Sequence, residues 1–103
     1  SIKYVLDYMN QHYSETISAR KLALMSNFSE YYFMKLFRQY TGKTLIEYLN
    51  DLRLEKAKAL LMHTDESITA IATQVGFNNT SYFIKRFQKA NGTTPKAFRK
   101  NLS

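Results

Sequence analysis

The chain of 103 residues contains no cysteine and only one proline and three glycines. Without cysteine there is no disulfide framework, thiolate metal cluster or thiol nucleophile. The scarcity of proline and glycine, together with 15% aromatic residues, argues against a disordered or collagen-like chain. No apolar run approaches the roughly 20 residues of a membrane span, and residues 1–10 do not resemble a signal peptide. These absences predict one small, soluble, cytoplasmic domain over residues 1–103.

Acidic residues are absent from residues 67–103, which carry six lysines and arginines. Residues 20–43 are also basic, with five cations and one acid, whereas residues 44–66 hold five acids and three cations. The whole chain has a net charge of +7. The electrostatic field of a positively charged chain attracts polyanions. Two basic blocks that flank an acidic one also differ from an ordinary protein surface, on which charges of both signs are mixed. The charge pattern therefore favours nucleic acid as the partner.

Apolar residues recur at helical spacing along the chain, and no segment alternates with a period of two. The pattern therefore predicts an all-α fold. Thr44 and Glu47 stand three apart, as in a capping box at a helix start. The expected helices cover residues 2–13, 18–25 with Ser18 as cap, 29–42 between Ser29 and Gly42, 44–62, 67–76 between Ser67 and Gly76, 78–92 with Asn78 or Asn79 as cap, and a last short helix from Thr94-Pro95 through Phe98.

These helices are expected to turn apolar stripes toward a core. Arg53 falls on such a stripe, and we interpret it as a buried or half-buried structural cation paired with an acid. The expected inward residues are Ile2, Val5, Leu6 and Met9; Leu22 and Ala23; Phe33, Leu36, Phe37 and Tyr40; Ile46, Leu49, Ala57, Leu60 and Leu61; Ile68, Ile71, Ala72 and Val75; and Phe83, Phe87 and Ala90.

The sequence contains an internal repeat, which decides the architecture. The segment Leu22-Ala23 aligns with Ile71-Ala72 at an offset of 49, as does Phe28 with Phe77, so the second turn is one residue longer. The repeat predicts two related helix-turn-helix units, about 1–43 and 67–103, joined by a linker helix of about 44–62. At an offset of fifty, residues 29–44 match 79–94 through Tyr32 and Tyr82, Phe33 and Phe83, Lys35 and Lys85, Phe37 and Phe87, Gly42 and Gly92, and Thr44 and Thr94.

The second helix of each unit has a cationic outward face that contains few acids. Such a face suits the DNA major groove, which admits one helix whose side chains meet base edges while cations reach phosphates. For Met34 and Ile84 the alternative is poorly covered core. The two faces consist of Tyr31, Met34, Lys35 and Arg38 in the first unit and Thr80, Ser81, Ile84, Lys85 and Gln88 in the second.

The second unit, SITAIATQVGFNNTSYFIKRFQKANGTTPKAFRK, resembles the signature of the AraC/XylS family of bacterial transcription regulators. The matching features are the Ile-x-x-Ile-Ala helix, Gly-Phe, Ser-Tyr-Phe, a basic residue before Phe, Gly-x-x-Pro and Phe-Arg. The likeness continues through the first unit and YLNDLRLEKAKALL. It implies a C-terminal DNA-binding domain of seven helices. Most members carry a separate sensor or dimerisation domain, which is missing here, so the chain resembles an excised fragment or a small single-domain member.

The resemblance also implies roles for individual residues. Ser29, Arg86 and Thr94 are implied to lie close to phosphate, and by their charge we expect the same of Arg38, Lys43 and Lys89. The implied base-facing residues are Tyr31, Met34 and Lys35 in the first recognition helix and Thr80, Ser81, Ile84 and Lys85 in the second.

These observations predict sequence-specific binding of double-stranded DNA for transcription regulation, by a monomer whose two recognition helices enter successive major grooves. RNA polymerase is a candidate second partner, and only the resemblance favours activation over repression. The alternative is a basic nucleic-acid or protein-interaction adaptor that reads no operator. An enzyme is disfavoured, because the sequence has no phosphate-binding glycine loop, activated nucleophile, metal-ligand spacing or cofactor motif. RNA is less suited because its A-form helix hides the major groove.

Overall fold

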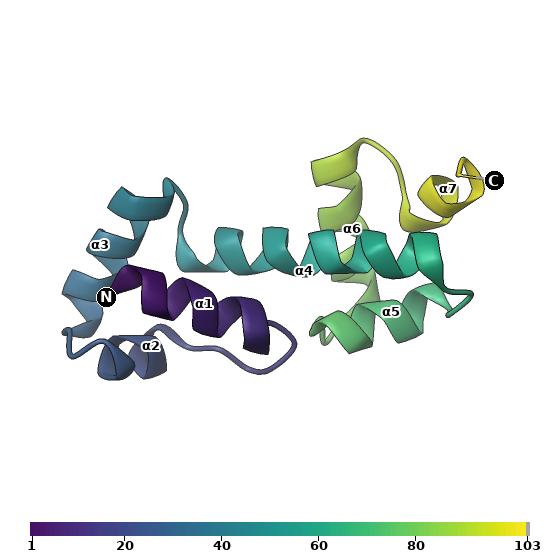
Figure 1. Cartoon of the computed structure of the whole chain (residues 1–103). Coiled ribbons are helices and arrows are strands. Elements are labelled where there is room, and N and C mark those ends of the chain that lie inside the picture. Colours follow the sequence, from purple (N-terminus) through teal and green to yellow (C-terminus); the bar gives the residue numbers. More distant parts are fainter. Residues whose placement is uncertain (103) are drawn as a thin grey trace. The chain divides into compact units, whose positions relative to one another are not determined.

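The computed structural model describes residues 1–102, in which seven α-helices and no strand are found (Figure 1). The all-α prediction is therefore confirmed. The chain divides into two compact units, unit 1 (Ser1–Asn50) and unit 2 (Asp51–Ser103). Within the described part, no helix combines the length and apolar character needed to cross a membrane. The helices are α1 (Ile2–His12), α2 (Ala19–Met25), α3 (Glu30–Thr41), α4 (Leu45–His63), α5 (Ile68–Val75), α6 (Thr80–Asn91) and α7 (Pro95–Lys100).

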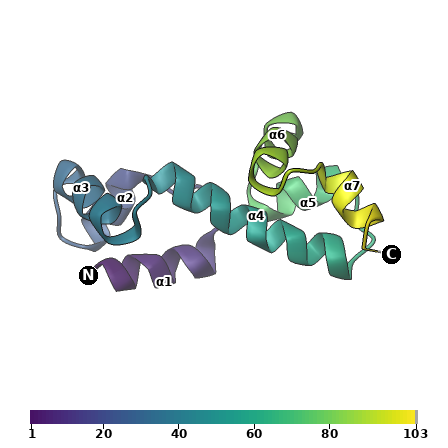
Figure 2. The ribbon, with the colours of Figure 1, turned by 90° about the horizontal axis from the view of Figure 1, so that it is seen from above.

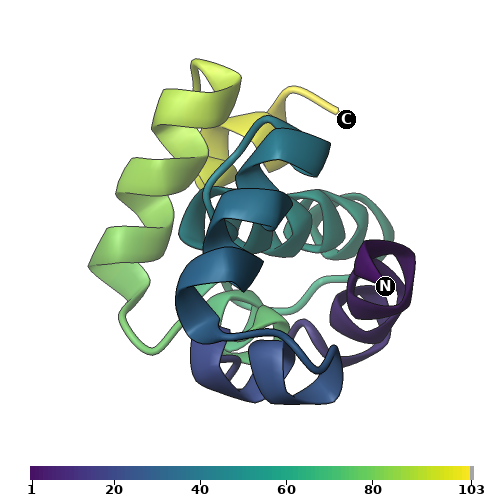
Figure 3. The ribbon, with the colours of Figure 1, turned by 90° about the vertical axis from the view of Figure 1, so that its left-hand side faces the viewer.

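Unit 1 consists of α1, α2, α3 and the first turns of α4. Figure 2 and Figure 3 both show α2 and α3 lying together, with α1 beside them. The centre of the unit is formed by side chains with no exposed surface, among them Val5, Met9, Leu22, Phe33 and Phe37. Each of these helices therefore buries one stripe, as the 3.6-residue period predicts.

Unit 2 consists of the C-terminal part of α4 with α5, α6 and α7. Figure 1 shows α5 and α6, in green, against this part of α4, and α7, in yellow, near its end. Ile71, Val75, Phe83 and Phe87 have no exposed surface, and Pro95 is also fully buried. The core of unit 2 is thus aromatic and aliphatic in the same manner as that of unit 1.

The repeat extends beyond the segment that the sequence match covered, because α7 has the role in unit 2 that the start of α4 has in unit 1. Thr44 Oγ1 accepts a hydrogen bond from the Glu47 amide at 3.2 Å, and Thr94 Oγ1 accepts one from the Ala97 amide at 3.1 Å. One turn later, Tyr48 meets Phe37 edge to face at 5.4 Å between ring centres. At the equivalent positions, Phe98 meets Phe87 at 5.6 Å in the same manner.

The first helices of the two units also correspond. In α1 the buried residues are Ile2, Val5 and Met9, and in the second part of α4 the buried residues Leu54, Ala57 and Leu61 repeat the same spacing of three and four. Each unit is therefore a set of four helical segments, and α4 contributes its start to unit 1 and its end to unit 2.

The caps and turns of the two units agree with the sequence prediction. Asn27 (φ 60°) and Gly76 (φ 109°) both have left-handed backbone conformations, 49 residues apart. After each of them a phenylalanine amide bonds back to an alanine carbonyl, Phe28 to Ala23 at 3.0 Å and Phe77 to Ala72 at 2.9 Å. Ser29 caps α3 and Asn79 caps α6, so Asn78 is the extra residue of the second turn.

Three residues predicted to point inward are exposed, and those predictions were wrong. Tyr40 is 63% exposed, and Ala90, its equivalent fifty residues later, is exposed as well. Both residues lie in the last turn of their helix. At this end the helix extends beyond the segments that cover its inner face, so the side chains are exposed. Ile46 is also 63% exposed, because Leu45, one position earlier, is the residue that α4 buries in its first turn.

The buried face of α4 does not follow one continuous stripe. Leu45 and Leu49 are buried in unit 1, whereas Leu54, Ala57 and Leu61 are buried in unit 2. The prediction of a single inward track along the whole of α4 therefore included Ile46 and left out Leu45 and Leu54. A single helical period describes a helix that packs against one core, whereas α4 packs against the cores of both units.

Candidate nucleic-acid interface

The helix α3 is held in place by its inner face and its ends. Phe33 and Phe37 have no exposed surface and pack against each other at 5.8 Å between ring centres. Ser29 Oγ accepts a hydrogen bond from the Tyr32 amide at 3.2 Å, which satisfies one of the free amides of the first turn. Gly42 (φ 76°) ends the helix in a left-handed conformation. The helix is thus anchored from within, and its outer face is left to solvent.

The helix α6 is held in the same manner at positions fifty residues later. Phe83 and Phe87 are fully buried, with ring centres 5.9 Å apart. Asn79 Oδ1 accepts a hydrogen bond from the Tyr82 amide at 2.9 Å, and Gly92 (φ 72°) ends the helix. The two candidate recognition helices therefore have the same inner scaffold.

The outer face of α3 is largely solvent-exposed. Tyr31 is 79% exposed and Met34 is 37% exposed, so Met34 is not part of the core. Lys35 and Arg38 are exposed on the same side, and Glu30 is the one acid of the helix. This face combines two cations with an aromatic ring and a thioether, groups that can meet phosphates and base edges.

The outer face of α6 is more polar and carries no acid. Ser81, Lys85 and Gln88 are exposed, whereas Thr80 and Ile84 are half-buried. Ile84 is therefore better covered than Met34. Lys35 and Lys85 are equivalent in the repeat and both are exposed, which gives each helix a cation at the same place.

Of the six residues expected near phosphate, two hydroxyls act as helix caps. The hydroxyl oxygens of Ser29 and Thr94 each accept an amide hydrogen, at 3.2 and 3.1 Å. Because a hydroxyl also carries one donor hydrogen, each can still donate to an anion while capping its helix. Arg38, Lys43 and Lys89 have exposed side chains. These five residues are therefore chemically able to take the predicted role.

Arg86 lies in a different environment from the other expected phosphate contacts. Its side chain is half-buried, and its Nε atom is buried without a hydrogen-bond partner in the described part of the chain. The equivalent position in unit 1 holds Leu36, which is also half-buried. The aliphatic part of Arg86 thus occupies the place of a leucine side chain, which leaves only the end of the guanidinium group for an anion.

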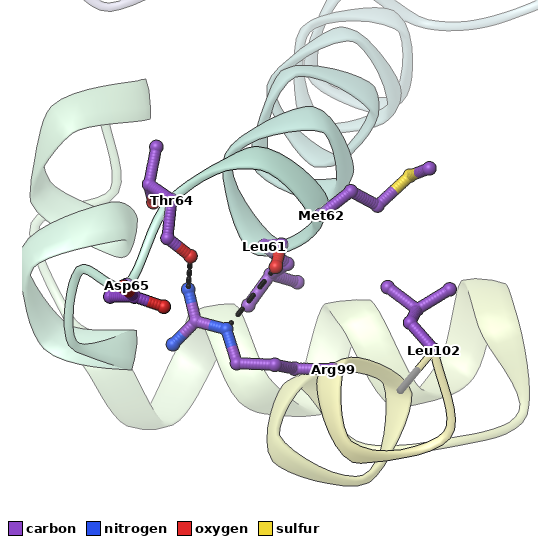
Figure 4. A pocket seen from close by; sticks show the side chains of 6 residues that line it. All are labelled: Leu61, Met62, Thr64, Asp65, Arg99 and Leu102. Carbon is purple, nitrogen blue, oxygen red and sulfur yellow. Dashed lines mark hydrogen bonds between the residues drawn. The ribbon is translucent and has the colours of Figure 1, made fainter.

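From the sequence, Arg99 was assigned no role, and it entered only as a charge of the basic block and as part of the Phe-Arg feature of the family resemblance. Its guanidinium donates hydrogen bonds to three backbone carbonyls, those of Leu61 (Nε, 3.2 Å), Thr64 (Nη2, 3.2 Å) and Glu66 (Nη1, 2.6 Å). Figure 4 shows the bonds to Leu61 and Thr64. The fork-shaped guanidinium therefore fastens α7 to the end of α4 and the turn after it. The Phe-Arg pair near the end of the sequence was the available signal.

Arg99, Leu61 and Thr64 border a small surface pocket of about 290 Å³, which is also lined by Met62, Asp65 and Leu102 (Figure 4). In the close-up, the Arg99 side chain extends between the turn at Thr64 and the end of α4. The guanidinium nitrogens of Arg99 donate to backbone carbonyls, so Arg99 has a structural role at this pocket, where it connects α7 to α4 within unit 2.

Arg53 also has a structural place. It is half-buried, and its guanidinium carbon lies 5.8 Å from the centre of the Phe77 ring. Burial lowers the pKa of Arg53 from its ordinary value, but a guanidinium keeps its charge in proteins. The half-buried position is as predicted, and the ring of Phe77 provides favourable cation–π contact. The acid expected beside it stays a prediction.

Comparison with known proteins relates this arrangement to described regulators. A sequence profile described as a helix-turn-helix domain matches residues 22–101. The regulatory protein PocR of Salmonella typhimurium is 37% identical over 102 residues, which are 99% of this chain and 34% of PocR. The chain therefore spans about a third of the length of that relative.

Two solved structures have the same fold. The DNA-binding domain of the global transcriptional factor AdpA, in complex with a target DNA, matches with a TM-score of 0.91 and 26% identity, covering 96% of this chain and 89% of that one. A Chromobacterium violaceum transcriptional regulator, described as having an AraC-type DNA-binding domain, matches with a TM-score of 0.88 and 28% identity, covering 95% of this chain and 88% of that one.

Proposed function

Since the chain belongs to the helix-turn-helix domain family, in its AraC/XylS branch, we propose that it binds double-stranded DNA in a sequence-specific manner and regulates transcription. The observation that carries this proposal is the matched construction of α3 and α6. Both helices are anchored by a pair of buried phenylalanines and capped by a polar side chain, and both have an exposed lysine at the same repeat position. A helix presented in this manner fits the major groove.

Within this proposal the exposed and half-buried side chains of the interface divide into two groups. The base-facing group comprises Tyr31, Met34 and Lys35 on α3 and Thr80, Ser81, Ile84 and Lys85 on α6. The phosphate-facing group comprises Ser29, Arg38, Lys43, Arg86, Lys89 and Thr94. The exposure of most of these side chains supports their assignment as DNA contacts. The assignment of Arg86 has the least support, because its Nε atom is buried. Base contacts carry sequence information, whereas phosphate contacts carry affinity and salt dependence.

We further propose that residues 1–103 act as one monomeric reading unit, with the two recognition helices in successive major grooves. The repeat supports this, because each of the two units has its own complete recognition helix. The two outward faces differ in sequence, so the DNA site should be non-palindromic.

The alternative is a basic adaptor that binds polyanions without reading sequence. Competition binding with duplex DNA, duplex RNA and anionic vesicles at several salt concentrations separates the two functions. Selection of bound sequences from random duplexes then provides the site. A selected consensus that competes at least tenfold better than a scrambled duplex supports the proposal. Equal binding to scrambled DNA, RNA and vesicles would contradict it and favour the adaptor.

The remaining proposals concern the whole protein. RNA polymerase is the proposed second partner, activation is the proposed direction of regulation, and a sensor or dimerisation domain is proposed as part of the full-length regulator. A role on bacterial DNA would put the protein in the cytoplasm. We propose no catalytic or cofactor-dependent role for these residues.

A further inference from the structure

An apolar hollow of about 340 Å³ opens on the surface of unit 2, where the starts of α5, α6 and α7 come together. Its apolar walls include Ile68, Ile84 and Pro95, and the methyl group of Thr80 adds to them. Thr94 and Lys96 also line it, which puts a hydroxyl and a cation beside apolar surface. A ligand that combines an apolar body with an anionic group therefore suits this lining.

The position of the hollow connects it with the proposed DNA interface. Thr80 and Ile84 are two of the proposed base-facing residues of α6, and Thr94 is a proposed phosphate contact. The hollow thus reaches from the base-facing side of α6 to the phosphate-facing start of α7. No acidic residue stands between positions 67 and 103, so nothing in this segment repels a phosphate by charge.

The equivalent positions of unit 1 have different chemistry. Glu30 stands in place of Thr80, Met34 in place of Ile84 and Ile46 in place of Lys96. A carboxylate near the start of α3 disfavours a phosphate there, and the cation is missing at position 46. Of the two equivalent places, the one in unit 2 therefore combines apolar walls with a cation and has no acidic residue in its lining.

We propose that this hollow takes one thymidine nucleotide of the bound DNA, with the thymine C5 methyl against Ile84 and Thr80, the deoxyribose against Ile68, and the phosphate near Lys96. This inference rests on the proposed function and names the chemical group that α6 reads. In the major groove, the C5 methyl of thymine is the one apolar group on a base edge. The polar edges of guanine, adenine or cytosine would lose hydrogen bonds to water against these walls.

The test uses the duplex obtained by sequence selection and replaces each thymine singly by uracil, which removes the methyl and keeps the base pair. We expect a loss of about fourfold in affinity at one or two positions beneath α6, as burial of one carbon predicts. At such a position, replacing the T·A pair by 5-methylcytosine·G should bind about fourfold tighter than replacing it by cytosine·G. Methyl-dependent binding in both comparisons supports the inference.

Protein variants link this effect to the hollow. Ile84→Ala should reduce the ratio of thymine to uracil affinity to nearly one, and Thr80→Ser, which removes only a methyl, should reduce it in part. Met62→Ala is the matched control, because it removes an apolar side chain that is 52% exposed and lies outside the hollow, and the ratio should stay at about four. A thermal melt of each variant checks that it is folded.

Three outcomes would overturn the inference. Affinity that is insensitive to uracil at every position, with selective binding intact, would contradict the methyl contact and leave the proposed function standing; any A·T preference would then arise from duplex deformability. A uracil effect that persists in both folded Ile84→Ala and Thr80→Ser would place the methyl contact elsewhere. No preference for the selected duplex over a scrambled one would overturn the proposed function together with this inference.

Discussion

The two helix-turn-helix units differ much more on the outer faces of α3 and α6 than in their interiors. Inside, Phe33 and Phe37 correspond to Phe83 and Phe87, and all four have no exposed surface. Outside, Lys35 and Lys85 are the only identical pair among the proposed base-facing positions. The interior determines where each helix lies, whereas the outer face can vary, so the two units are expected to read different DNA sequences.

The strongest test of the shared interior is truncation of equivalent phenylalanines. Phe33→Ala and Phe83→Ala should each reduce the free energy of unfolding by about 3–5 kcal/mol, because both leave a cavity among fully buried side chains. Urea denaturation followed by circular dichroism measures the loss. Tyr40→Ala serves as control and should cost less than about 0.5 kcal/mol, because Tyr40 is 63% exposed. A small loss for only one of the two phenylalanines would break the equivalence of the units.

Arg99 and Leu49 occupy equivalent positions and fasten their units by different means. Leu49 is buried by apolar packing, whereas Arg99 donates to three carbonyls. Arg99→Leu therefore gives unit 2 the residue of unit 1, and we expect a loss of about 2 kcal/mol in unfolding free energy, because the carbonyls lose a charged donor. Arg99→Lys, which keeps the charge without the fork, should recover less than half of this. Unchanged stability of Arg99→Leu in thermal and urea denaturation would contradict this role.

The proposed phosphate contacts distribute the electrostatic attraction over both units. Alanine substitution of Arg38 or Lys43 in unit 1, and of Lys89 in unit 2, should each flatten the slope of log affinity against log salt by about one and weaken all DNA sequences alike. Fluorescence anisotropy titrations from 50 to 200 mM salt measure this. Arg86→Ala should flatten the slope less, because its Nε is buried. A slope that stays the same after all four substitutions would exclude an electrostatic role for these residues.

The smallest expected difference lies in the two turns. Gly76→Ala should cost about 1 kcal/mol of unfolding free energy, because a β-carbon disfavours the left-handed backbone conformation at φ 109°. Asn27→Gly should change stability by less than about 0.5 kcal/mol, since asparagine tolerates this conformation and glycine adds entropy to the unfolded chain. Thermal melting measures both. A larger loss for Asn27→Gly than for Gly76→Ala would reverse the predicted ranking.

Local signals in the sequence were sufficient to predict most of the fold. The caps Ser18, Ser29, Ser67 and Thr94 and the stops Gly42, Gly76 and Gly92 were all predicted, because capping depends on residues within one turn. Tyr40, Ala90 and Ile46 were placed wrongly, because burial depends on what covers a helix and not on its period alone.

The candidate site was predicted less completely than the fold. The exposed lysines at 35 and 85 follow from the helical period, whereas the hollow beside Ile84 requires three helix starts that are distant in sequence to meet. The three carbonyls bound by Arg99 lie 33 to 38 residues away from it, a separation that no local pattern encodes.

We propose that the outer faces of α3 and α6 both contact DNA, each in its own major groove. Methylation and uracil interference on the selected duplex, with the wild-type chain and with Lys35→Ala and Lys85→Ala, tests it most directly. We expect two contacted major-groove segments about 10 base pairs apart on a non-palindromic site. Lys35→Ala should lose the contacts of one segment and Lys85→Ala those of the other. One contacted segment in the wild type, or loss of the same segment in both variants, would contradict the claim.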